Sequence, residues 1–204
     1  HVSVGSEMGI VEIGKHNRIC AGAAVGGPPQ DLKYKGEPTK LIIGDHNMIR
    51  EMATLNIGTP GGGGVTRLGS HTLIMAYSHI AHDCQVGDHV VIANTSQLAG
   101  HVIIEEHVKI GGMCAVSQFC RVGKYAYIAG DTSINKDILP FSMAQGKFAV
   151  MRAANTIGME RSGFSKESVA SIKTAIRIIT KGNDTVENSI KRILEECKPD
   201  PALD

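Results

Sequence analysis

The sequence predicts a mainly β fold, a parallel β-helix built from six-residue repeats, and two observations lead to this prediction. An aliphatic residue returns at every sixth position from Leu68 to Ile134 without a gap. Four residues after each of these positions, as far as Thr132, comes a second residue that is small or β-branched. A unit of six residues is too short for a helical repeat and long enough for one short strand and a turn. Such units stack into a three-sided coil around a continuous aliphatic column.

The repeat organises residues 1–144, with two interruptions. The first, at about 26–42, contains Gly-Gly-Pro-Pro and several charges, and the second, at about 56–67, contains four consecutive glycines. Neither composition can fill inward positions, so we expect both segments to leave the coil as loops. Long loops in compact domains are often functional. We expect this of the first loop, whereas the second reads as a flexible, tolerated insertion.

Residues 145–204 form a predicted C-terminal helical region. Ser165 is placed to cap a helix that Gly182 ends, and Asp184 with Glu187 has capping-box spacing before a second helix. Each helix has one apolar face, which we expect to pack against the other helix and the coil. The apolar residues are Val169, Ile172, Ile176 and Ile179, and then Val186, Ile190, Ile193, Leu194 and Cys197.

Composition narrows the functional class. The net charge is +1, with 21 basic and 20 acidic residues, which gives no electrostatic basis for binding nucleic acid. Of five cysteines, Cys84, Cys114 and Cys120 fall on inward positions, so we expect buried free thiols in a reducing compartment. Neither a signal peptide nor a membrane-length apolar run is visible, which favours the cytoplasm and no stable membrane insertion. Because the first residue is His1 rather than Met, we expect a trimmed or fragmentary chain.

Two histidines occupy positions of the six-residue repeat at which a turn residue is not expected. Six others come three residues after an inward aliphatic residue, where turn residues belong, but His79 and His82 do not. Residues eighteen apart stack at the spacing of paired strands, roughly 4.8 Å, so His82, Gly100 and Gln118 share one column, beside Asp83 in the next. A histidine, a carboxylate and a bare glycine N–H can serve as general base, orienting group and oxyanion donor.

This arrangement suits acyl transfer to a hydroxyl. No Ser or Cys with a suitable partner stands out as a nucleophile, so the pattern favours direct attack by the acceptor. Spacing leaves two alternatives open. The histidines can be solvent-facing decoration, or His79, His82 and His101 can ligate zinc, with Asp83 supporting the His82 ring.

Four ordered motifs and a fifth segment carry a resemblance to a known family. They lie at residues 30–34, 79–84, 98–101, 118–120 and 163–165. Together they resemble the UDP-N-acetylglucosamine acyltransferases, which catalyse the first step of lipid A synthesis. The resemblance implies a left-handed β-helix and a homotrimer with active sites between subunits. It also implies acyl carrier protein as donor and partner, a UDP-sugar acceptor, and no metal or cofactor.

The resemblance also implies roles for individual residues. His82 would be the general base, Asp83 its orienting group, and the Gly100 N–H the oxyanion donor. Asp31, in the first loop, would bind the 3-hydroxyl of the acyl donor at the site of a neighbouring chain. The other implied substrate-binding residues are Lys33, His79, His101 and Gln118 around acceptor and donor, Gly130 as acyl-length ruler, and Asn155 with Arg161 at the nucleotide.

Five positions depart from the family's usual residues. Asn56, Ser117 and Phe148 replace histidines, Ile157 replaces a glutamate and Ser162 an arginine. The base and oxyanion residues remain while nucleotide contacts decrease, which predicts retained acyl transfer with an altered acceptor.

Our hypothesis is transfer of a 3-hydroxyacyl chain from acyl carrier protein to position 3 of UDP-N-acetylglucosamine or a 3-amino analogue, in lipid A biosynthesis. The alternatives are an N-acyltransferase acting on another nucleotide sugar, a γ-class carbonic anhydrase-like zinc protein, and a non-catalytic scaffold. The sequence does not fix the acyl chain length.

Overall fold

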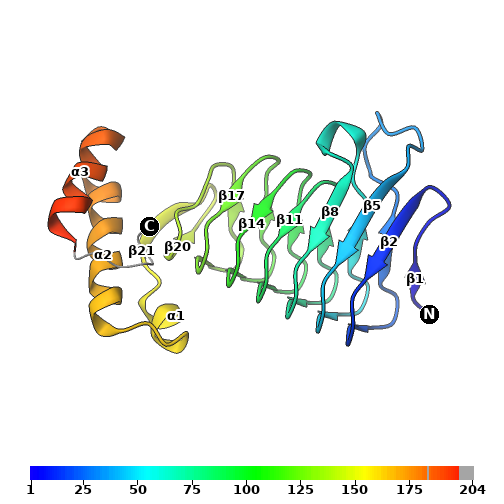
Figure 1. The fold of residues 1–204 in the computed structure, drawn as a ribbon, viewed down its shortest axis with the longest axis horizontal. Helices are drawn as coiled ribbons and strands as arrows, with labels where there is room; N and C mark the ends of the chain where they lie inside the picture. The colour runs from blue at the N-terminus through cyan, green and yellow to red at the C-terminus, as the bar shows by residue number, and fades with distance from the viewer. Residues whose placement is uncertain (183, 198–204) are drawn as a thin grey trace.

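The computed structural model describes residues 1–182 and 184–197, and shows a three-sided prism followed by a small helical end (Figure 1). Each side of the prism is a sheet of short parallel strands. The first sheet contains β1 (Ser3–Val4), β4 (Ala24–Gly27), β7 (Thr54–Asn56), β10 (His79–Ile80), β13 (Gln97–Leu98), β16 (Ala115–Val116) and β19 (Ser133–Ile134). The second contains β2 (Gly9–Ile13), β5 (Thr39–Ile43), β8 (Val65–Leu68), β11 (Gln85–Val86), β14 (Ile103–Ile104) and β17 (Arg121–Val122). The third contains β3 (Arg18–Ile19), β6 (Met48–Ile49), β9 (Leu73–Ile74), β12 (Val91–Ile92), β15 (Lys109–Ile110), β18 (Tyr127–Ile128), β20 (Ser142–Gln145) and β21 (Val150–Ala154).

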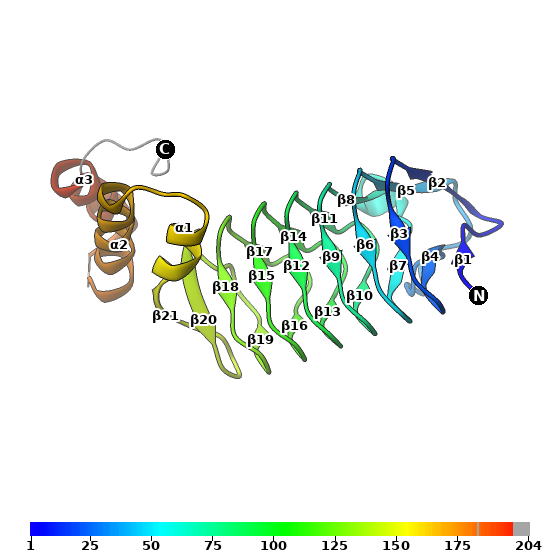
Figure 2. The ribbon, with the colours of Figure 1, turned by 90° about the horizontal axis from the view of Figure 1, so that it is seen from below.

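The strands pair in the register that the repeat predicts. In the first sheet His79 lies opposite Gln97 and Ile80 opposite Leu98, a separation of eighteen residues. The same separation holds along β11 and β14 and along β12 and β15, so successive coils stack as Figure 2 shows. The prediction that residues eighteen apart are neighbours is confirmed.

The predicted aliphatic column fills the interior of the prism. Ile74, Ile80, Ile92 and Leu98 are fully buried, and Cys84 lies with them on the second inward position. Burying each such aliphatic side chain stabilises the fold by roughly 1.5–3 kcal/mol, which is how a thin prism with few aromatic residues can be stable. The expectation of buried thiols is confirmed, since Cys84, Cys114 and Cys120 are all free and buried.

Sharp corners join the three sheets, and each corner uses a residue in the left-handed region. The six histidines of the shared phase all have φ between 57° and 62°. Histidine is enriched among the non-glycine residues that adopt this conformation. Between the second and third sheets these turn residues stack ring on ring. We call this set the ladder corner: His16, His46, His71, His89, His107, Tyr125 and Phe141.

Both interruptions of the repeat leave the prism as loops. The first connects β4 to β5 and the second, which contains the 3-10 turn η1 (Pro60–Gly62), connects β7 to β8. Figure 1 shows them rising from the same side of the prism, beside β5 and β8. Asp31 of the first loop and Thr59 of the second line one pocket, so the two loops lie against each other.

The helical end follows an antiparallel pair, β20 and β21. Helix α1 spans Thr156–Arg161, α2 spans Lys166–Lys181 and α3 spans Val186–Glu196. Ser165 caps α2 as predicted, because its side chain accepts a hydrogen bond from the Ser168 N–H. None of the helices in the described residues has the length and apolar character needed to cross a lipid bilayer.

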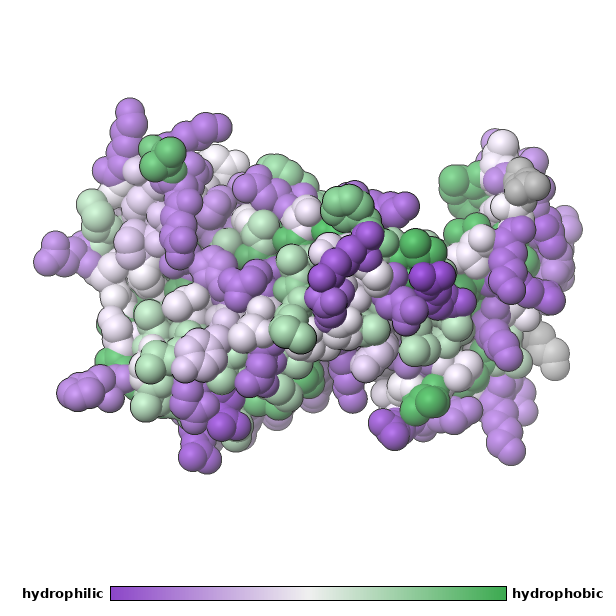
Figure 3. All heavy atoms as spheres, turned by 180° about the vertical axis from the view of Figure 1, so that it is seen from behind, coloured by the Kyte–Doolittle hydropathy of each residue, from purple (hydrophilic) through white to green (hydrophobic). Residues whose placement is uncertain are grey.

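One expectation for α3 is wrong and a second is confirmed only in part. Its cap is Thr185, whose side chain accepts from the Asn188 N–H, while Asp184 instead forms an ion pair with Arg192. Its apolar face packs only in part, since Cys197 is buried against Ser171 of α2 while Val186 and Leu194 are more than three-quarters exposed. The reason is the rotation of the helix, which buries Ser189. Green side chains accordingly interrupt the hydrophilic surface of the helical end in Figure 3.

Candidate active site

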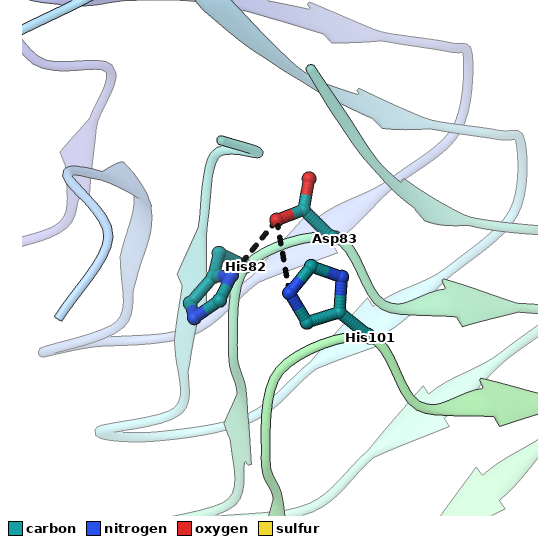
Figure 4. Close-up of side chains that lie close together, drawn as sticks. All are labelled: His82, Asp83 and His101. Atoms are coloured by element: carbon teal, nitrogen blue, oxygen red, sulfur yellow. Dashed lines mark hydrogen bonds and ion pairs between the residues drawn. The ribbon is translucent and has the colours of Figure 1, made fainter. Parts of the chain in front are cut away.

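His82 and Asp83 form a buried hydrogen-bonded pair at the corner between the first and second sheets (Figure 4). His82 Nδ1 lies 2.8 Å from Asp83 Oδ2, and the residues are 7% and 4% exposed. Because a carboxylate can only accept, Nδ1 carries the proton and Nε2 presents a free lone pair. An imidazole in this tautomer can take a proton from a bound hydroxyl.

Asp83 itself is held by its surroundings. Its backbone lies in the left-handed region, with φ 61°, and its N–H donates to Thr66 Oγ1 over 2.8 Å. Thr59 donates twice to the carboxylate, from its backbone N–H to Oδ1 over 2.9 Å and from its hydroxyl to Oδ2 over 2.6 Å. Together with His82, three donors therefore meet the two oxygens of this carboxylate and hold it in place.

Gly100 lies directly against the His82 ring, as the column predicts. A Cβ added to Gly100 would lie 2.5 Å from His82 Cε1 and 2.7 Å from Nε2, so only glycine fits there. Across residues 1–182 and 184–197, the hydrogen bonds leave the Gly100 N–H without an acceptor. This N–H can therefore receive an oxyanion that develops beside His82 Nε2. Gln118, next in the column, is exposed.

The neighbouring histidines are arranged around the pair. His101 meets the His82 ring edge to face at 5.1 Å, lies 3.9 Å from Asp83 Oδ2, and stacks on Phe119 at 4.6 Å. His79 Nδ1 lies 2.7 Å from Thr54 Oγ1, and burial, followed by the nearby His82, lowers the pKa of His79. Both predicted pocket histidines thus lie beside the dyad.

The first loop approaches from one side. The Asp31 side chain accepts a hydrogen bond from the Lys33 N–H over 2.9 Å. Asp31 and Lys33 line a pocket of about 190 Å³ together with Thr59, the residue that holds Asp83. Within one chain, Asp31 and Lys33 therefore share a pocket with Thr59, and Thr59 contacts the Asp83 carboxylate directly.

The remaining predicted residues lie at other corners. The side chain of Asn155 caps α1, with Oδ1 accepting from Gly158 N and Nδ2 donating to Tyr125 O, and Arg161 is exposed in the last turn of α1. Gly130 lies between the third and first sheets. A single chain does not bring these three residues to His82.

A basic pocket accompanies Asn155 at the ladder corner. It has a volume of about 260 Å³, and its lining includes His89, His107, Lys109 and Ser162 besides Asn155. Imidazole, ammonium and hydroxyl groups are suitable partners for phosphate oxygens.

The geometry also bears on covalent catalysis by a nucleophilic side chain and on metal binding. Burial raises the pKa of the Cys84 thiol to about 12, so this thiol next to the dyad is no nucleophile. Ligand atoms of His82, Asp83 and His101 lie within 4.8 Å of one another, whereas the zinc set expected from the sequence contained His79 in place of Asp83.

The sequence did not point to Thr59 and Thr66. Thr66 occupies an inward position, where a threonine fits the repeat without comment. Thr59 lies in the loop that we expected to be a tolerated insertion. One signal in the sequence could have indicated a turn at Thr59. This residue directly precedes Pro60, and proline is common at the first position of a helical turn.

Comparison with known proteins agrees with this architecture. A family model described as "Udp N-acetylglucosamine O-acyltransferase; Domain 2" matches residues 137–204, and one described as "Bacterial transferase hexapeptide (six repeats)" matches residues 66–100. An acyl-(acyl-carrier-protein)–UDP-N-acetylglucosamine O-acyltransferase of Anaeromyxobacter dehalogenans is 47% identical over 179 residues, which is 88% of this chain and 70% of that protein. The chain belongs to the UDP-N-acetylglucosamine O-acyltransferase family.

Other members of this acyltransferase family support the assignment. The protein of the same name from Myxococcus xanthus is 48% identical over 188 residues, 92% of this chain and 73% of that one. A UDP-N-acetylglucosamine acyltransferase structure from Bacteroides fragilis superposes with a TM-score of 0.92 at 36% identity, covering 98% of this chain and 76% of that chain. One from Francisella novicida gives 0.91 at 37%, covering 96% and 72%. The left-handed parallel β-helix and an acyltransferase activity, both expected from the sequence, are confirmed.

Proposed function

We propose that this chain transfers a 3-hydroxyacyl group from acyl carrier protein to the 3-hydroxyl of UDP-N-acetylglucosamine, in lipid A biosynthesis, with His82 as general base. Donor and acceptor are those in the names of its relatives. The observation that carries the proposal is the His82 ring, which Asp83 holds at Nδ1 and which lies against the backbone of Gly100, whose N–H has no acceptor among the described residues.

The geometry supports direct attack by the acceptor. His82 Nε2 takes the proton of the sugar hydroxyl while its oxygen bonds to the thioester carbon. The Gly100 N–H stabilises the negative carbonyl oxygen, and Asp83 stabilises the imidazolium that forms. The carbon–sulfur bond then breaks, and His82 returns its proton to the departing thiolate. An ester and a free thiol result, and His82 is neutral again.

The acceptor atom is the part that needs a direct assay. Ile157, 60% exposed on α1, offers no charge or hydrogen bond at a position where the family usually has a glutamate. This favours a 3-amino sugar, or another nucleotide sugar, as second candidate acceptor.

Purified protein should be given acyl carrier protein loaded with 3-hydroxyacyl chains of several lengths, and a panel of UDP-sugars that includes the 3-amino analogue. Transfer to UDP-N-acetylglucosamine with a product that mild alkali cleaves supports ester formation. An alkali-stable product on the 3-amino sugar alone would replace the first candidate by the second.

The positions of Asn155 and Arg161 favour a homotrimer with sites between subunits. Asn155 lies at the ladder corner, separated from His82 by the width of the second sheet, and Arg161 lies in the last turn of α1, the helix that Asn155 caps. A UDP-sugar that touches both His82 and this corner therefore needs two chains. For Asp31 the family resemblance implies action at the site of a neighbouring chain, whereas within one chain Asp31 shares a pocket with Thr59, so the assignment of Asp31 needs its own test.

Mixed trimers test this arrangement. Asp31→Ala and His82→Ala variants should each be inactive, but co-expression should restore activity, because some interfaces then combine an intact Asp31 from one chain with an intact His82 from another. A mixture as inactive as its components would place Asp31 and His82 of the same chain in one site.

We propose that the reaction uses no metal. Asp83 Oδ2 already accepts from the Thr59 hydroxyl and from His82, so ligating zinc through this oxygen would break the contacts that hold the dyad. Elemental analysis of purified protein tests this. One zinc per chain, with activity lost on chelation and restored by zinc, would contradict it. The cytoplasmic location expected from the sequence stays a prediction.

A further inference from the structure

The second loop reaches the catalytic carboxylate. Thr59 is 5% exposed, and the Asp83 side chain that it contacts is fully buried. The backbone N–H of Thr59 donates to Oδ1 and its hydroxyl to Oδ2, at 2.9 and 2.6 Å. A loop without the sequence repeat thus supplies two of the three donors on this carboxylate.

Glycine lets the loop come this close. A Cβ added to Gly62 would lie 2.0 Å from Asp83 Cγ and 2.3 Å from Oδ2. At Gly61, one residue away, an added Cβ meets nothing within 4 Å. The loop backbone therefore lies directly on the carboxylate at Gly62, and at Gly61 it faces the pocket that Asp31 and Lys33 also line.

The two contacts restrict how Asp83 can move. With His82 alone as partner, the carboxylate can rotate about its terminal bond and exchange its oxygens. The Thr59 N–H on Oδ1 and hydroxyl on Oδ2 fix one orientation, with Oδ2 facing His82 Nδ1. Charge-assisted hydrogen bonds of this kind are short and about twice as strong as neutral ones. A fixed carboxylate in turn fixes the tautomer and orientation of the imidazole.

We propose that the turn at residues 59–62 is a positioning element for the general base, in which Thr59 clamps the Asp83 carboxylate and Gly62 makes room for it. The inference rests on the proposed function, since Thr59 acts only through Asp83 and His82. The glycine-rich segment is then a built part of the active site and not a tolerated insertion.

Two alanine substitutions in the turn form a matched pair. In Gly62→Ala the new methyl group displaces the carboxylate, because a side-chain end yields more readily than backbone. We expect kcat to fall on the order of 100-fold, the effect of misplacing a catalytic group by about 1 Å. Gly61→Ala makes the same change to loop entropy without touching Asp83, so kcat should stay within about twofold of wild type. Because Gly61 shares a pocket with Asp31 and Lys33, any effect of this variant should appear in KM for the acyl donor. KM for the nucleotide sugar should change little in either variant. Equal kcat in the two variants would overturn the proposal.

Two substitutions at Thr59 distinguish the effect of its hydroxyl group from the effect of its side-chain shape. Thr59→Val should lower kcat on the order of 10-fold, the value of one charge-assisted hydrogen bond, and Thr59→Ser should recover most of the loss. Thr72→Val serves as control, because it removes a comparable buried hydroxyl, bonded to Asn47 Oδ1 over 2.7 Å. If Thr72→Val lowers kcat as much at the same loss of melting temperature, the effect of Thr59 is merely structural and the proposal fails.

Asp83→Asn provides the test of mechanism. In that background Thr59→Val should change kcat less than twofold, because the residue through which it acts is already altered. If the losses of kcat caused by Thr59→Val and Asp83→Asn multiply in the double variant, Thr59 does not act through Asp83. If Asp83→Asn and His82→Ala themselves keep wild-type turnover, the proposed function is wrong. If they lose turnover while Thr59→Val and Gly62→Ala keep it, only the positioning role is wrong.

Discussion

Two corners of the prism carry histidines at the same phase of the repeat and use them differently. At the ladder corner, His46 stacks between His16 and His71 at 4.7 and 4.9 Å, with near-parallel rings. At the corner of the dyad, His101 has the same left-handed backbone and also stacks, yet its ring faces Asp83 and His82. The position of a histidine within the six-residue repeat therefore decides where it lies on the prism, while the side chains around it decide which chemistry it can perform.

The largest difference between the corners should appear in turnover. His82→Ala removes the proposed base, and a general base typically contributes 10² to 10⁴ in rate. His46→Ala removes a ladder ring remote from the proposed site and should leave kcat within about threefold, in line with surface substitutions elsewhere. Steady-state kinetics make the measurement, on variants that analytical ultracentrifugation shows to assemble as the wild-type protein does. Similar kcat in both variants would remove the distinction between the corners.

Glycines at equivalent positions of two corners give the next largest effect. Gly100→Ala keeps the N–H but places a methyl group against the His82 ring, so we expect a loss on the order of 100-fold in kcat. Gly112, twelve residues on, holds the same place between the third and first sheets, where an added Cβ meets nothing closer than 3.3 Å. Gly112→Ala should therefore keep turnover, and an equal loss there would point to general damage to the coil.

The smallest predicted effect is a pH dependence of folding stability that arises from His107 at the ladder corner. Burial, and then the neighbouring His89, lowers the pKa of His107 below its ordinary value. As pH falls through the ordinary value, near 6.5, the unfolded chain takes up a proton that the folded chain does not, so the folded state loses stability. The loss stops once pH is below the pKa of the folded state.

His107→Tyr keeps a stacking ring and removes this titration. The melting temperature of the variant should therefore fall less between pH 8 and pH 5.5 than that of the wild type. Parallel curves for the two proteins would show that His107 does not contribute to acid sensitivity.

The six-residue repeat determines which part of the active site could be predicted from the sequence. His82, Gly100 and Asp83 lie within the uninterrupted repeat, where a separation of eighteen residues translates directly into contact, so their arrangement was predicted. Thr59 lies in a loop whose path no period describes, and its two hydrogen bonds to Asp83 depend on a turn with glycines at chosen points. The sequence could show that the loop leaves the coil but not where it returns.

The same limit applies to the helical end. Helix starts were read from local capping chemistry, correctly at Ser165 and one residue off at Thr185. The side of α3 that meets α2 depends on tertiary packing, so the apolar stripe identified the buried face only in part, at Cys197 but not at Val186 or Leu194. Asn155 shows a further limit, since the side chain assigned to a nucleotide already caps α1 with one atom and bonds Tyr125 O with the other.

A crystal structure with UDP-N-acetylglucosamine and a non-hydrolysable acyl-phosphopantetheine tests the central claim most directly. We expect the acceptor 3-oxygen to lie within hydrogen-bond distance of His82 Nε2 and the acyl carbonyl oxygen to accept a hydrogen bond from the Gly100 N–H. A sugar bound away from His82, or a carbonyl oxygen held by groups other than Gly100, would contradict it.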